Sequence, residues 1–529
     1  MTPIRRTAMT NNAATDTTSN QAVMTRIRDA MAQVHQLSDP TMRSQHPKTL
    51  GVVQATFQVH DLPDAHRIGV FATPGPIAAW VRFSNGRERD DRRPDVHGMA
   101  IKLVNVPGDS MALDTEHAAA QDFVLADHPV FFARDAAHFL QFLVMKGGHA
   151  GQSAAAKAAG ATEDEIAALA TQQLRELVGA FPVIREFFKT VPSVLAQSYF
   201  SQTPYRFGDR VVKYFARAEE PPKADGPLDT PDALRDQMWQ VLTTERKPVR
   251  FAFGIELMTD PTAMPLEDAT VAWESSEQVV LASITIPPQD FSSADRHAFA
   301  EALSFSPWHS RAVHEPLGSL NQARREAYMD SARTRHAATG AVSQAPTESQ
   351  CNAETLNRFF AALKAGDVRG VQLCLHPDVH FNDIGFDLRG REVGAMWHMI
   401  LSKDLRVTYR DIRVDGQGGT AHWECDYEFS RDSGSSPRHV HNEIDSKFQF
   451  QGGLIREHED NCDFWAWFAQ AMGPVAAAAR AADLVEGALE RLVARDVPLD
   501  VERTVRAKVQ TAAREKIDRF IAQHREYAG

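Results

Sequence analysis

A stretch in the second half of the chain, NQARREAYMDSARTRH at residues 321–336, carries residue types that can do chemistry. Successive positions of an α-helix are rotated by about 100°, so Arg324, Tyr328 and Arg335 fall on one face of the predicted helix. A phenol between two guanidinium groups fits a phenolate that binds iron, because tyrosine needs nearby cations and the metal to stay ionised at neutral pH. The alternative is an exposed amphipathic helix whose arginines pair with acidic side chains.

Two earlier stretches place polar side chains beside apolar ones. The run RSQHPK holds Arg43 and His46 just before a β-rich segment at residues 52–59, and the simplest interpretation of a single histidine there is an exposed loop imidazole. In AAWVRFSNG, strand alternation puts Arg82 and Ser84 on one face. An arginine that points inward needs an anionic partner. The alternative is an exposed edge strand.

The composition is ordinary for a globular protein. The chain has 529 residues and a formal net charge of −12, which predicts two or three domains and disfavours nucleic acid and anionic membrane surfaces as partners. No apolar run approaches the roughly 20 residues that span a bilayer. Residues 1–22 lack the apolar segment of a signal peptide and are interpreted as a disordered tail. We therefore expect a cytoplasmic location.

All four cysteines lie beyond residue 350, and their spacing is unlike that of zinc sites. We interpret them as isolated buried thiols. They are Cys351, Cys374, Cys425 and Cys462. The first 350 residues therefore offer no thiolate ligand, so iron held there must be bound by histidine or tyrosine.

The order of predicted elements indicates an α+β protein with a boundary near residue 340. Before it, β-rich runs frame an Ala-rich helical region at residues 151–197; residues 338–350 are small and polar, as in a linker. After it, helices precede four long strands, a pattern that predicts an α+β cone. The predicted parts are a β-rich first domain at 23–337, a cone domain at 351–473 and a helical extension at 474–529.

Six runs in the first part resemble, in the right order, the catalase superfamily of haem proteins over residues 40–337. These runs are RSQHPK, VRFS, HGMAIKLVNVPG, HPVFFARDAAHF, TPYRFGDRVVKY and FSPWH. Most specific is Arg324 followed four positions later by Tyr328, with Asp330 and Ser331 continuing the proximal signature of the family. The resemblance implies an antiparallel β-barrel with surrounding helices and a bound ferric haem.

The resemblance also implies roles for individual residues. His46 matches the distal acid–base group, Ser84 the hydroxyl paired with it, and Tyr328 the axial iron ligand whose phenolate Arg324 stabilises. Three arginines match propionate-binding positions and one phenylalanine matches the ring stacked on the macrocycle: Arg43, Arg82, Arg335 and Phe139. Three arginines are also what two buried carboxylates would require.

The distal side departs from the family pattern. Ala126 stands where the family carries an asparagine, and Asp127, the next residue, is the nearest polar side chain and the remaining catalytic candidate. Glu326 and Ala332 also depart from the proximal signature. Such departures resemble catalase-related haem peroxidases and catalase-like enzymes that rearrange fatty-acid hydroperoxides. The expected activity is decomposition of hydrogen peroxide or organic hydroperoxides, as in a response to oxidative stress.

Residues 352–473 resemble the SnoaL-like branch of the NTF2-like superfamily, through FFAALKAGD, HPDVHFND, AHWECDYEF and FQGGLIREHEDNCDFW. That family includes ketosteroid isomerases, polyketide cyclases and members that only bind or dimerise. Asp383, Asp460 and Asp463 could act as general bases in an apolar pocket, or could be surface or capping aspartates. His439 and His441 share a strand face, which fits either a metal site or an exposed hairpin.

Two alternative functions follow from these patterns. One is an isomerase or cyclase acting in the cone, and the other is a haem-binding module without turnover. The expected partners are a small peroxide substrate and a second copy of the chain, with no nucleic acid and no membrane span. In the helical extension, apolar residues repeat on one face and predict docking on the cone domain or on a partner subunit. They are Val501, Val505, Val509, Ile517 and Ile521.

Overall fold

The computed structural model describes residues 21–31, 39–43, 45–223, 228–274, 276–341, 345–430, 436–473 and 499–527. The chain divides into two compact units, residues 1–346 and 347–529, and each is described by itself. The predicted tail lies almost entirely outside the described residues, as do residues 474–498 of the predicted helical extension.

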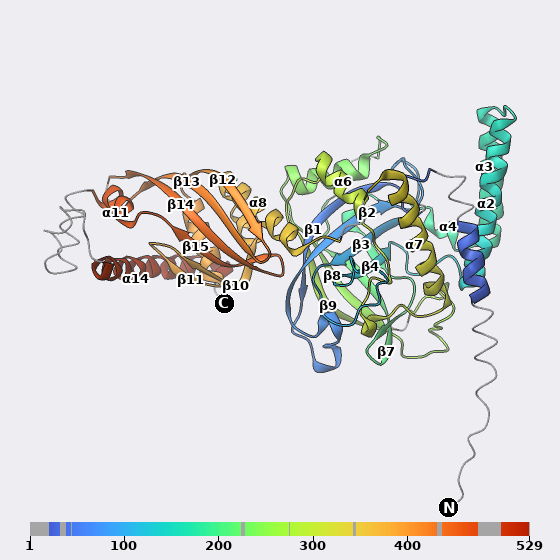
Figure 1. Cartoon of the computed structure of the whole chain (residues 1–529), viewed down its shortest axis with the longest axis horizontal. Coiled ribbons are helices and arrows are strands. Elements are labelled where there is room, and N and C mark those ends of the chain that lie inside the picture. Colours follow the sequence, from blue (N-terminus) through green and yellow to red (C-terminus); the bar gives the residue numbers. More distant parts are fainter. Residues whose placement is uncertain are drawn as a thin grey trace, which may run out of the picture. The chain divides into compact units, whose positions relative to one another are not determined.

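The first unit is built on an antiparallel sheet with the strand order β5-β4-β3-β2-β1-β9-β8-β7-β6 (Figure 1). A further pairing of β5 with β7 closes eight of these strands into a barrel within the described part of the unit. The strands are β1 Thr49–Val59, β2 Gly75–Asn85, β3 His97–Leu103, β4 Gln121–Ala126, β5 Ser198–Phe200, β6 Tyr205–Phe207, β7 Arg210–Glu219, β8 Val249–Leu257 and β9 Glu277–Ile286.

Aromatic side chains fill the barrel interior because alternate strand residues point inward. Phe57 on β1, Phe123 on β4 and Phe253 on β8 are almost fully buried. The rings of Phe57 and Phe253 meet edge to face with centroids 5.1 Å apart, and those of Phe123 and Phe253 lie 4.7 Å apart. Burial of each such ring stabilises the fold by about 1.5–3 kcal/mol. The barrel is therefore a packed core, and the chemistry must lie outside it.

Helices surround the barrel. They are residues 21–31, α2 Ala136–Ala158, α3 Glu163–Ala180, α4 Ile184–Phe187, α5 Ala233–Trp239, α6 Ala294–Ala302 and α7 Ser319–Thr339. Short turns of helix also occur: η1 Asp64–His66, η2 Gly69–Phe71, η3 Val194–Ala196, η4 Gln240–Thr244 and η5 Ala312–His314. Helix α7 ends at Gly340, whose φ of 66° lies in the left-handed region that glycine adopts at helix ends.

A second apolar cluster joins three helices of the first unit beside the barrel. Ile27 and Met31 of helix 21–31 belong to it, together with Phe139 of α2 and Leu320 and Ala327 of α7. The cluster fixes α7 against α2 and against the N-terminal helix. It therefore positions the helix face that carries Tyr328.

The second unit contains a six-stranded sheet in the order β11-β10-β15-β14-β13-β12. Its strands are β10 Leu375–Asn382, β11 Asp387–Arg389, β12 Arg406–Asp415, β13 Gly418–Phe429, β14 Arg438–Gln451 and β15 Leu454–Asn461. Its helices are α8 Glu348–Ala365, α9 Val368–Gln372, α10 Arg391–Leu401, α11 Phe464–Met472 and α14 Leu499–Gln523, followed by η6 Arg525–Tyr527. The predicted fold class is confirmed: an α+β chain with a closed antiparallel barrel, then a cone-like α+β region.

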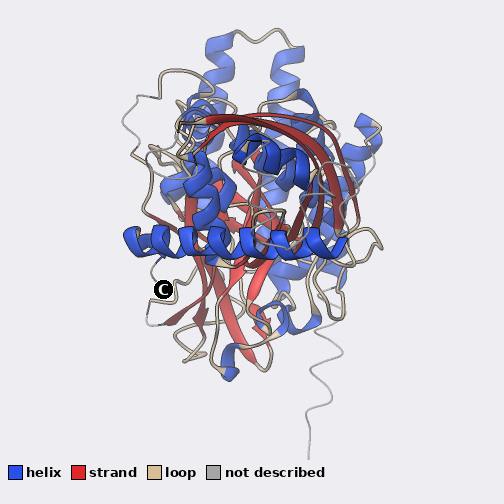
Figure 2. Cartoon of the chain, turned by 90° about the vertical axis from the view of Figure 1, so that its left-hand side faces the viewer, coloured by secondary structure: helices blue, strands red, loops and turns tan. Residues whose placement is uncertain are grey.

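Helix α14 packs on the second unit through the predicted apolar stripe. Ile517 is fully buried with the main cluster of that unit, and Val505 is fully buried against Phe464 and Phe468 of α11. In Figure 2 this helix is the long horizontal one. The part of α14 that the structure describes is therefore an element of the second unit.

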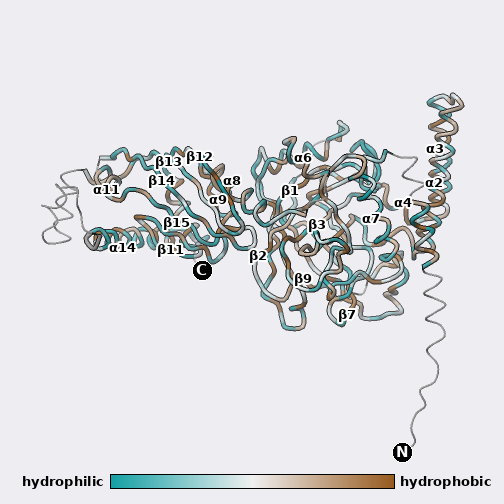
Figure 3. The backbone as a smooth tube through the Cα atoms, viewed as in Figure 1, coloured by the Kyte–Doolittle hydropathy of each residue, from teal (hydrophilic) through white to brown (hydrophobic). Residues whose placement is uncertain are grey.

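Hydrophilic and hydrophobic residues are interleaved along α2, α3 and α14 in Figure 3. Among the described residues, no helix has both the length and the apolar character needed to cross a membrane.

Residues 347–529 should fold without the rest of the chain, because Leu356, Phe359, Trp397 and their neighbours form a core of their own. We expect this part alone to unfold in one cooperative thermal transition, which circular dichroism would record. An aggregated or non-cooperative product would show that its stability depends on residues 1–346.

Candidate active site

A cavity of about 520 Å³ lies in the first unit, within the size range of small-molecule and cofactor sites. Its walls come from the segment before β1, from β2, β3 and β4, and from α2, α4 and α7. Eight of the predicted site residues line it: Arg43, His46, Ser84, Arg82, Phe139, Arg324, Tyr328 and Arg335. The fold thus gathers residues that are up to about 290 positions apart in the sequence.

Helix α7 contributes the phenol and two guanidinium groups, as its periodicity predicted. Nη2 of Arg324 donates to Oη of Tyr328 at 3.4 Å, and Nη1 of Arg324 donates to Oγ1 of Thr203 at 2.8 Å and to Oδ1 of Asn321 at 3.1 Å. Arg324 is buried, and the neutral oxygens of Thr203 and Asn321 hold its guanidinium group beside the phenol. A cation that donates to this oxygen favours the phenolate over the phenol.

His46 is held rigidly in the loop before β1. Its φ of 55° lies in the left-handed region, a strained conformation that surrounding contacts must maintain. The main-chain N–H of His46 donates to the carbonyl of Gly86 at 2.9 Å, and Arg82 donates to the carbonyl of His46 at 2.8 Å. The ring nitrogen Nδ1 lies 3.1 Å from Oγ of Ser84.

The ring of His46 rests against the main chain of Gly98 on β3. A Cβ atom at Gly98 would lie 2.7 Å from Nδ1 and Cε1 of this ring, and 2.8 Å from Oγ of Ser84. Contacts below 3.0 Å are essentially never made by a real Cβ. The absence of a side chain at Gly98 is therefore what lets His46 and Ser84 meet.

Burial keeps His46 uncharged. It lowers the pKa of His46 to about 3, and the neighbouring guanidinium of Arg82 acts in the same direction. At neutral pH the ring is therefore an imidazole that can accept a proton.

Three arginines line the cavity, and among the described residues a single acidic side chain pairs with one of them. Arg43 pairs with Glu301 at 2.6 Å, whereas Arg82 donates to Oγ1 of Thr49 and Arg335 donates to the carbonyl of Leu303. Nε of Arg335 is buried with no hydrogen-bond partner. Burial lowers the pKa of Arg335 to about 9, and the charge of Arg43 lowers it further. Such a group of buried cations calls for anionic ligands.

These residues fit a haem. Tyr328 offers the oxygen ligand for ferric iron, and Arg43, Arg82 and Arg335 offer more positive charge than Glu301 neutralises, as two carboxylates would require. This fit rests on Arg335. Its guanidinium group has no acidic partner among the described residues, and its buried Nε has no hydrogen-bond acceptor.

The structure places Asp127 away from the cavity. Ala126 lines the cavity, and Asp127, the next residue along the chain, points elsewhere. Its carboxylate accepts from the main-chain N–H of His97 at 2.8 Å and lies 3.0 Å from Nδ1 of the same histidine, with Lys189 at 3.4 Å. Asp127 therefore does not contact a ligand in the cavity, contrary to the direct catalytic role predicted for it. It acts on the site only by raising the pKa of His46 against the larger effect of burial.

Two residues at the site were not predicted from the sequence. Glu301 on α6 lies behind the cavity wall, where it neutralises Arg43 and accepts from Thr49 at 2.9 Å. Lys146 on α2 lines the cavity, and burial lowers its pKa to about 8. Between these polar groups the wall is aromatic, formed by Phe131, Phe132, Phe139, Phe142, Phe187, Phe188 and Phe305.

The second unit holds a separate group of acidic residues. Oδ1 of Asp383 accepts from the main-chain N–H groups of Gly385 at 2.7 Å and Phe386 at 2.5 Å. Burial raises the pKa of Asp383 to about 7, and the charge of Asp460 raises it further. Oδ1 of Asp460 lies 2.8 Å from Nε2 of His458.

The two histidines of the predicted hairpin, His439 and His441, are half exposed and both approach Oδ1 of Asp426 at 3.2 Å. Within the described residues they do not belong to a group of three ligands close enough to share one ion.

Comparison with known proteins gives two results. Residues 356–458 match the family model of the SnoaL-like domain. A fungal catalase is 18% identical, with 58% of this chain and 63% of that chain covered and a TM-score of 0.41. Catalase A from Saccharomyces cerevisiae is 17% identical, with 58% and 66% covered and a TM-score of 0.41. An NTF2-like protein from Burkholderia xenovorans is 15% identical, with 23% and 97% covered and a TM-score of 0.20.

No curated protein matches the chain. The chain spans less than two thirds of the length of the fungal and yeast catalases, at 63% and 66%. The described chain therefore has a closed antiparallel barrel in its first unit, and residues 356–458 of its second unit match the SnoaL-like domain.

Proposed function

We propose that the protein is a haem-dependent oxidoreductase that decomposes hydrogen peroxide or organic hydroperoxides. One observation carries the proposal: a single cavity brings together Tyr328 with its Arg324 partner, the uncharged His46 and a surplus of buried arginine charge. Each of these has a separate task in hydroperoxide cleavage. Together they form a site that can bind the cofactor and move a proton.

The residues of the cavity have separate roles in binding the cofactor. Tyr328 would hold ferric iron through its phenolate, which the hydrogen bond donated by Arg324 stabilises. Arg43, Arg82 and Arg335 would bind the propionates. When bound, the haem supplies the Lewis acid and the electrons for cleavage of the O–O bond.

His46 handles the proton. With Nδ1 held at Ser84, its Nε2 accepts the proton of the bound hydroperoxide and returns it to the leaving oxygen. A ring that is uncharged at neutral pH starts in the state that this step needs. Because Gly98 and Ser84 fix the ring, the transfer requires no search for the right orientation.

The cavity wall favours hydroperoxides other than hydrogen peroxide. Ala126 provides no amide to donate to a bound peroxide, and the nearby amide of Gln202 is already engaged with the carbonyls of His128 and Val130 at 3.1 and 2.7 Å. Loss of one donor to an oxyanion costs about 3 kcal/mol, or about a hundredfold in rate. Weak oxygen release from hydrogen peroxide, with better turnover of bulkier hydroperoxides, is part of the proposal.

The proposal also includes a cytoplasmic location and self-association.

A second candidate function lies in the second unit. The raised pKa of Asp383, about 7, makes this carboxyl a general base near neutral pH, as an isomerase or cyclase would need. A haem-binding module without turnover is the remaining alternative.

An absorption spectrum and a turnover assay on haem-loaded protein test the main proposal. We expect the Soret band of a tyrosinate-bound ferric haem, and faster turnover of cumene hydroperoxide than oxygen release from hydrogen peroxide. The control is Asp383→Asn, which should leave both signals unchanged. Bound haem without turnover of either peroxide would favour the binding module. Loss of turnover in Asp383→Asn would place the chemistry in the second unit.

A further inference from the structure

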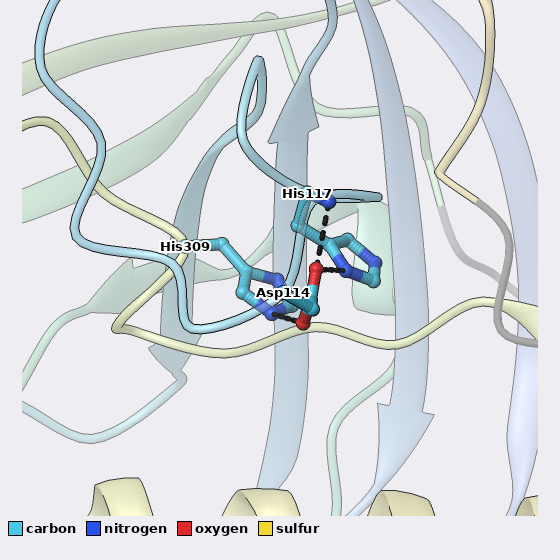
Figure 4. A group of neighbouring side chains, drawn as sticks. All are labelled: Asp114, His117 and His309. Carbon is cyan, nitrogen blue, oxygen red and sulfur yellow. Dashed lines mark hydrogen bonds and ion pairs between the residues drawn. The ribbon is translucent and has the colours of Figure 1, made fainter.

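A cluster of two histidines and one aspartate lies outside the cavity, where the loop between β3 and β4 meets the segment after α6. Asp114 and His117 come from that loop, and His309 comes from the segment 303–318. One ligand atom from each lies within 4.8 Å of the others. None of the three lines the cavity. Figure 4 shows the carboxylate of Asp114 beside the two rings, with an oxygen facing a nitrogen of each.

The ring of His309 has a fixed orientation. Its Nδ1 lies 2.8 Å from Oδ2 of Asp122, a fully buried carboxylate that also binds Lys102. Nζ of Lys102 also lies 3.3 Å from this nitrogen, but the shorter contact is the one to the carboxylate, which only accepts and so favours the proton on Nδ1. In an uncharged ring, the lone pair of Nε2 then points towards Oδ2 of Asp114 at 3.8 Å. Two acceptors face one another across this gap, and a cation between them would satisfy both.

His117 supplies the third ligand. Its ring stacks on that of His309, with centroids 3.9 Å apart and planes inclined by 9°, so both rings present a nitrogen on the same side. Nδ1 of His117 lies 2.7 Å from Oδ1 of Asp114, whereas its buried Nε2 has no hydrogen-bond partner. For Nδ1 of His117 to bind a metal, the ring proton must move to Nε2, and a bond to the metal then replaces the hydrogen bond to Asp114.

The surrounding main chain keeps the two segments together. The guanidinium of Arg311 donates to the carbonyls of Gly108, Ala118 and Ala120 at 2.6–2.9 Å. The main-chain N–H of Asp122 donates to the carbonyl of His309 at 2.7 Å. The two histidines are thus pre-positioned, while the carboxylate of Asp114, half exposed, can move and opens the site to solvent.

We propose that Asp114, His117 and His309 form a binding site for a divalent transition-metal ion of the zinc type, with Asp122 as the outer partner that orients His309. Two imidazoles and one carboxylate suit such an ion, and a hydrogen bond from a ligating histidine to a second carboxylate is typical of its sites. Ligand atoms of a tetrahedral zinc ion lie about 3.4 Å apart. The present 3.8 Å gap between Oδ2 of Asp114 and Nε2 of His309 exceeds this distance by only about 0.4 Å, so a small shift of Asp114 closes it.

The test is metal binding by the full-length, tag-free protein. Zn²⁺ is titrated in competition with a chromophoric chelator, and Co²⁺ reports the ligand geometry through its visible absorption. We expect one Zn²⁺ per chain, a tetrahedral-type Co²⁺ spectrum, and no competition from Mg²⁺, which prefers oxygen ligands. Loss of an outer partner costs metal sites 10–100-fold, so Asp114→Asn, which removes a direct ligand, should weaken Zn²⁺ binding at least about a hundredfold.

Three variants make the outcome decisive. Glu116→Gln removes an exposed carboxylate from the same loop and should leave the dissociation constant unchanged. His309→Gln should repeat the loss seen in Asp114→Asn. His441→Gln removes one ring beside Asp426 and should have no effect. The proposal is overturned if Asp114→Asn binds Zn²⁺ as tightly as wild type, if His441→Gln abolishes the site instead, or if no saturable site exists. The last result would leave only an ion pair between Asp114 and a charged His309.

Discussion

Tyr328→Phe should abolish stable haem binding and the tyrosinate-type Soret band. The substitution removes the phenol oxygen that accepts from Arg324 in the cavity wall, and no cysteine is present in the first 350 residues to replace it. Arg324 would then be left buried beside an apolar ring, which disfavours the cavity as a haem site further. Haem content per chain, measured by the pyridine haemochrome method after reconstitution, is the readout.

The matched control is Tyr199→Phe, which removes a buried phenol of the same unit. Its hydroxyl donates to the carbonyl of Val194 at 2.6 Å and is not part of the cavity wall. Loss of this hydrogen bond should cost about 1 kcal/mol of stability without changing haem content. If Tyr328→Phe binds haem with an unchanged spectrum, Tyr328 is not the ligand.

His46→Gln should retain haem and lower hydroperoxide turnover by about 10²–10⁴-fold, the usual contribution of a general acid–base group. Glutamine can occupy the space beside Gly98 and Ser84 but cannot take up a proton. Stopped-flow measurement of the first turnover with cumene hydroperoxide separates this step from product release. His60→Gln, just after β1 and outside the cavity wall, is the control and should react as wild type does. Equal rates for His46→Gln and wild type would remove His46 from the mechanism.

The pH profile adds a second readout for the same histidine. Because the pKa of His46 in the folded protein is about 3, its ring remains a base from pH 8 down to pH 5, and the acid limb of turnover should lie below pH 5. The unfolded chain takes up this proton near pH 6.5. The stabilising contribution of the uncharged ring is therefore present above about pH 6.5 and is lost as the pH falls towards 3. In His46→Gln this part of the acid sensitivity should disappear.

Local periodicity predicted the parts of the site that lie on single elements. Arg324, Tyr328 and Arg335 line the cavity together because α7 is one uninterrupted helix, and Arg82 and Ser84 do so because they alternate on β2. Alternation does not extend to Asp127, because β4 ends at Ala126. The carboxylate of Asp127 meets His97 instead of the cavity.

Contacts between distant segments could not be predicted in this way. Glu301 on α6 reaches Arg43 across 258 positions of sequence, and no spacing rule links them. The same holds for His309, which is 192 positions from His117 and meets it only because the segment after α6 runs along the loop after β3. Asp114 and His117 did carry a local signal, a carboxylate three residues before a histidine, but the third ligand depends on tertiary structure.

The cavity wall also contains two thioethers, those of Met31 and Met99, although every cysteine lies in the second unit. Both methionines are almost fully buried, so only a reagent admitted to the cavity reaches their sulfur atoms. A hydroperoxide is such a reagent, and it converts methionine into the polar sulfoxide. Under the proposed function, the hydroperoxide would thus slowly damage the protein that binds it. Oxidation of Met31 would weaken the packing of the N-terminal helix against α2, and a methionine sulfoxide reductase would be needed to reverse it.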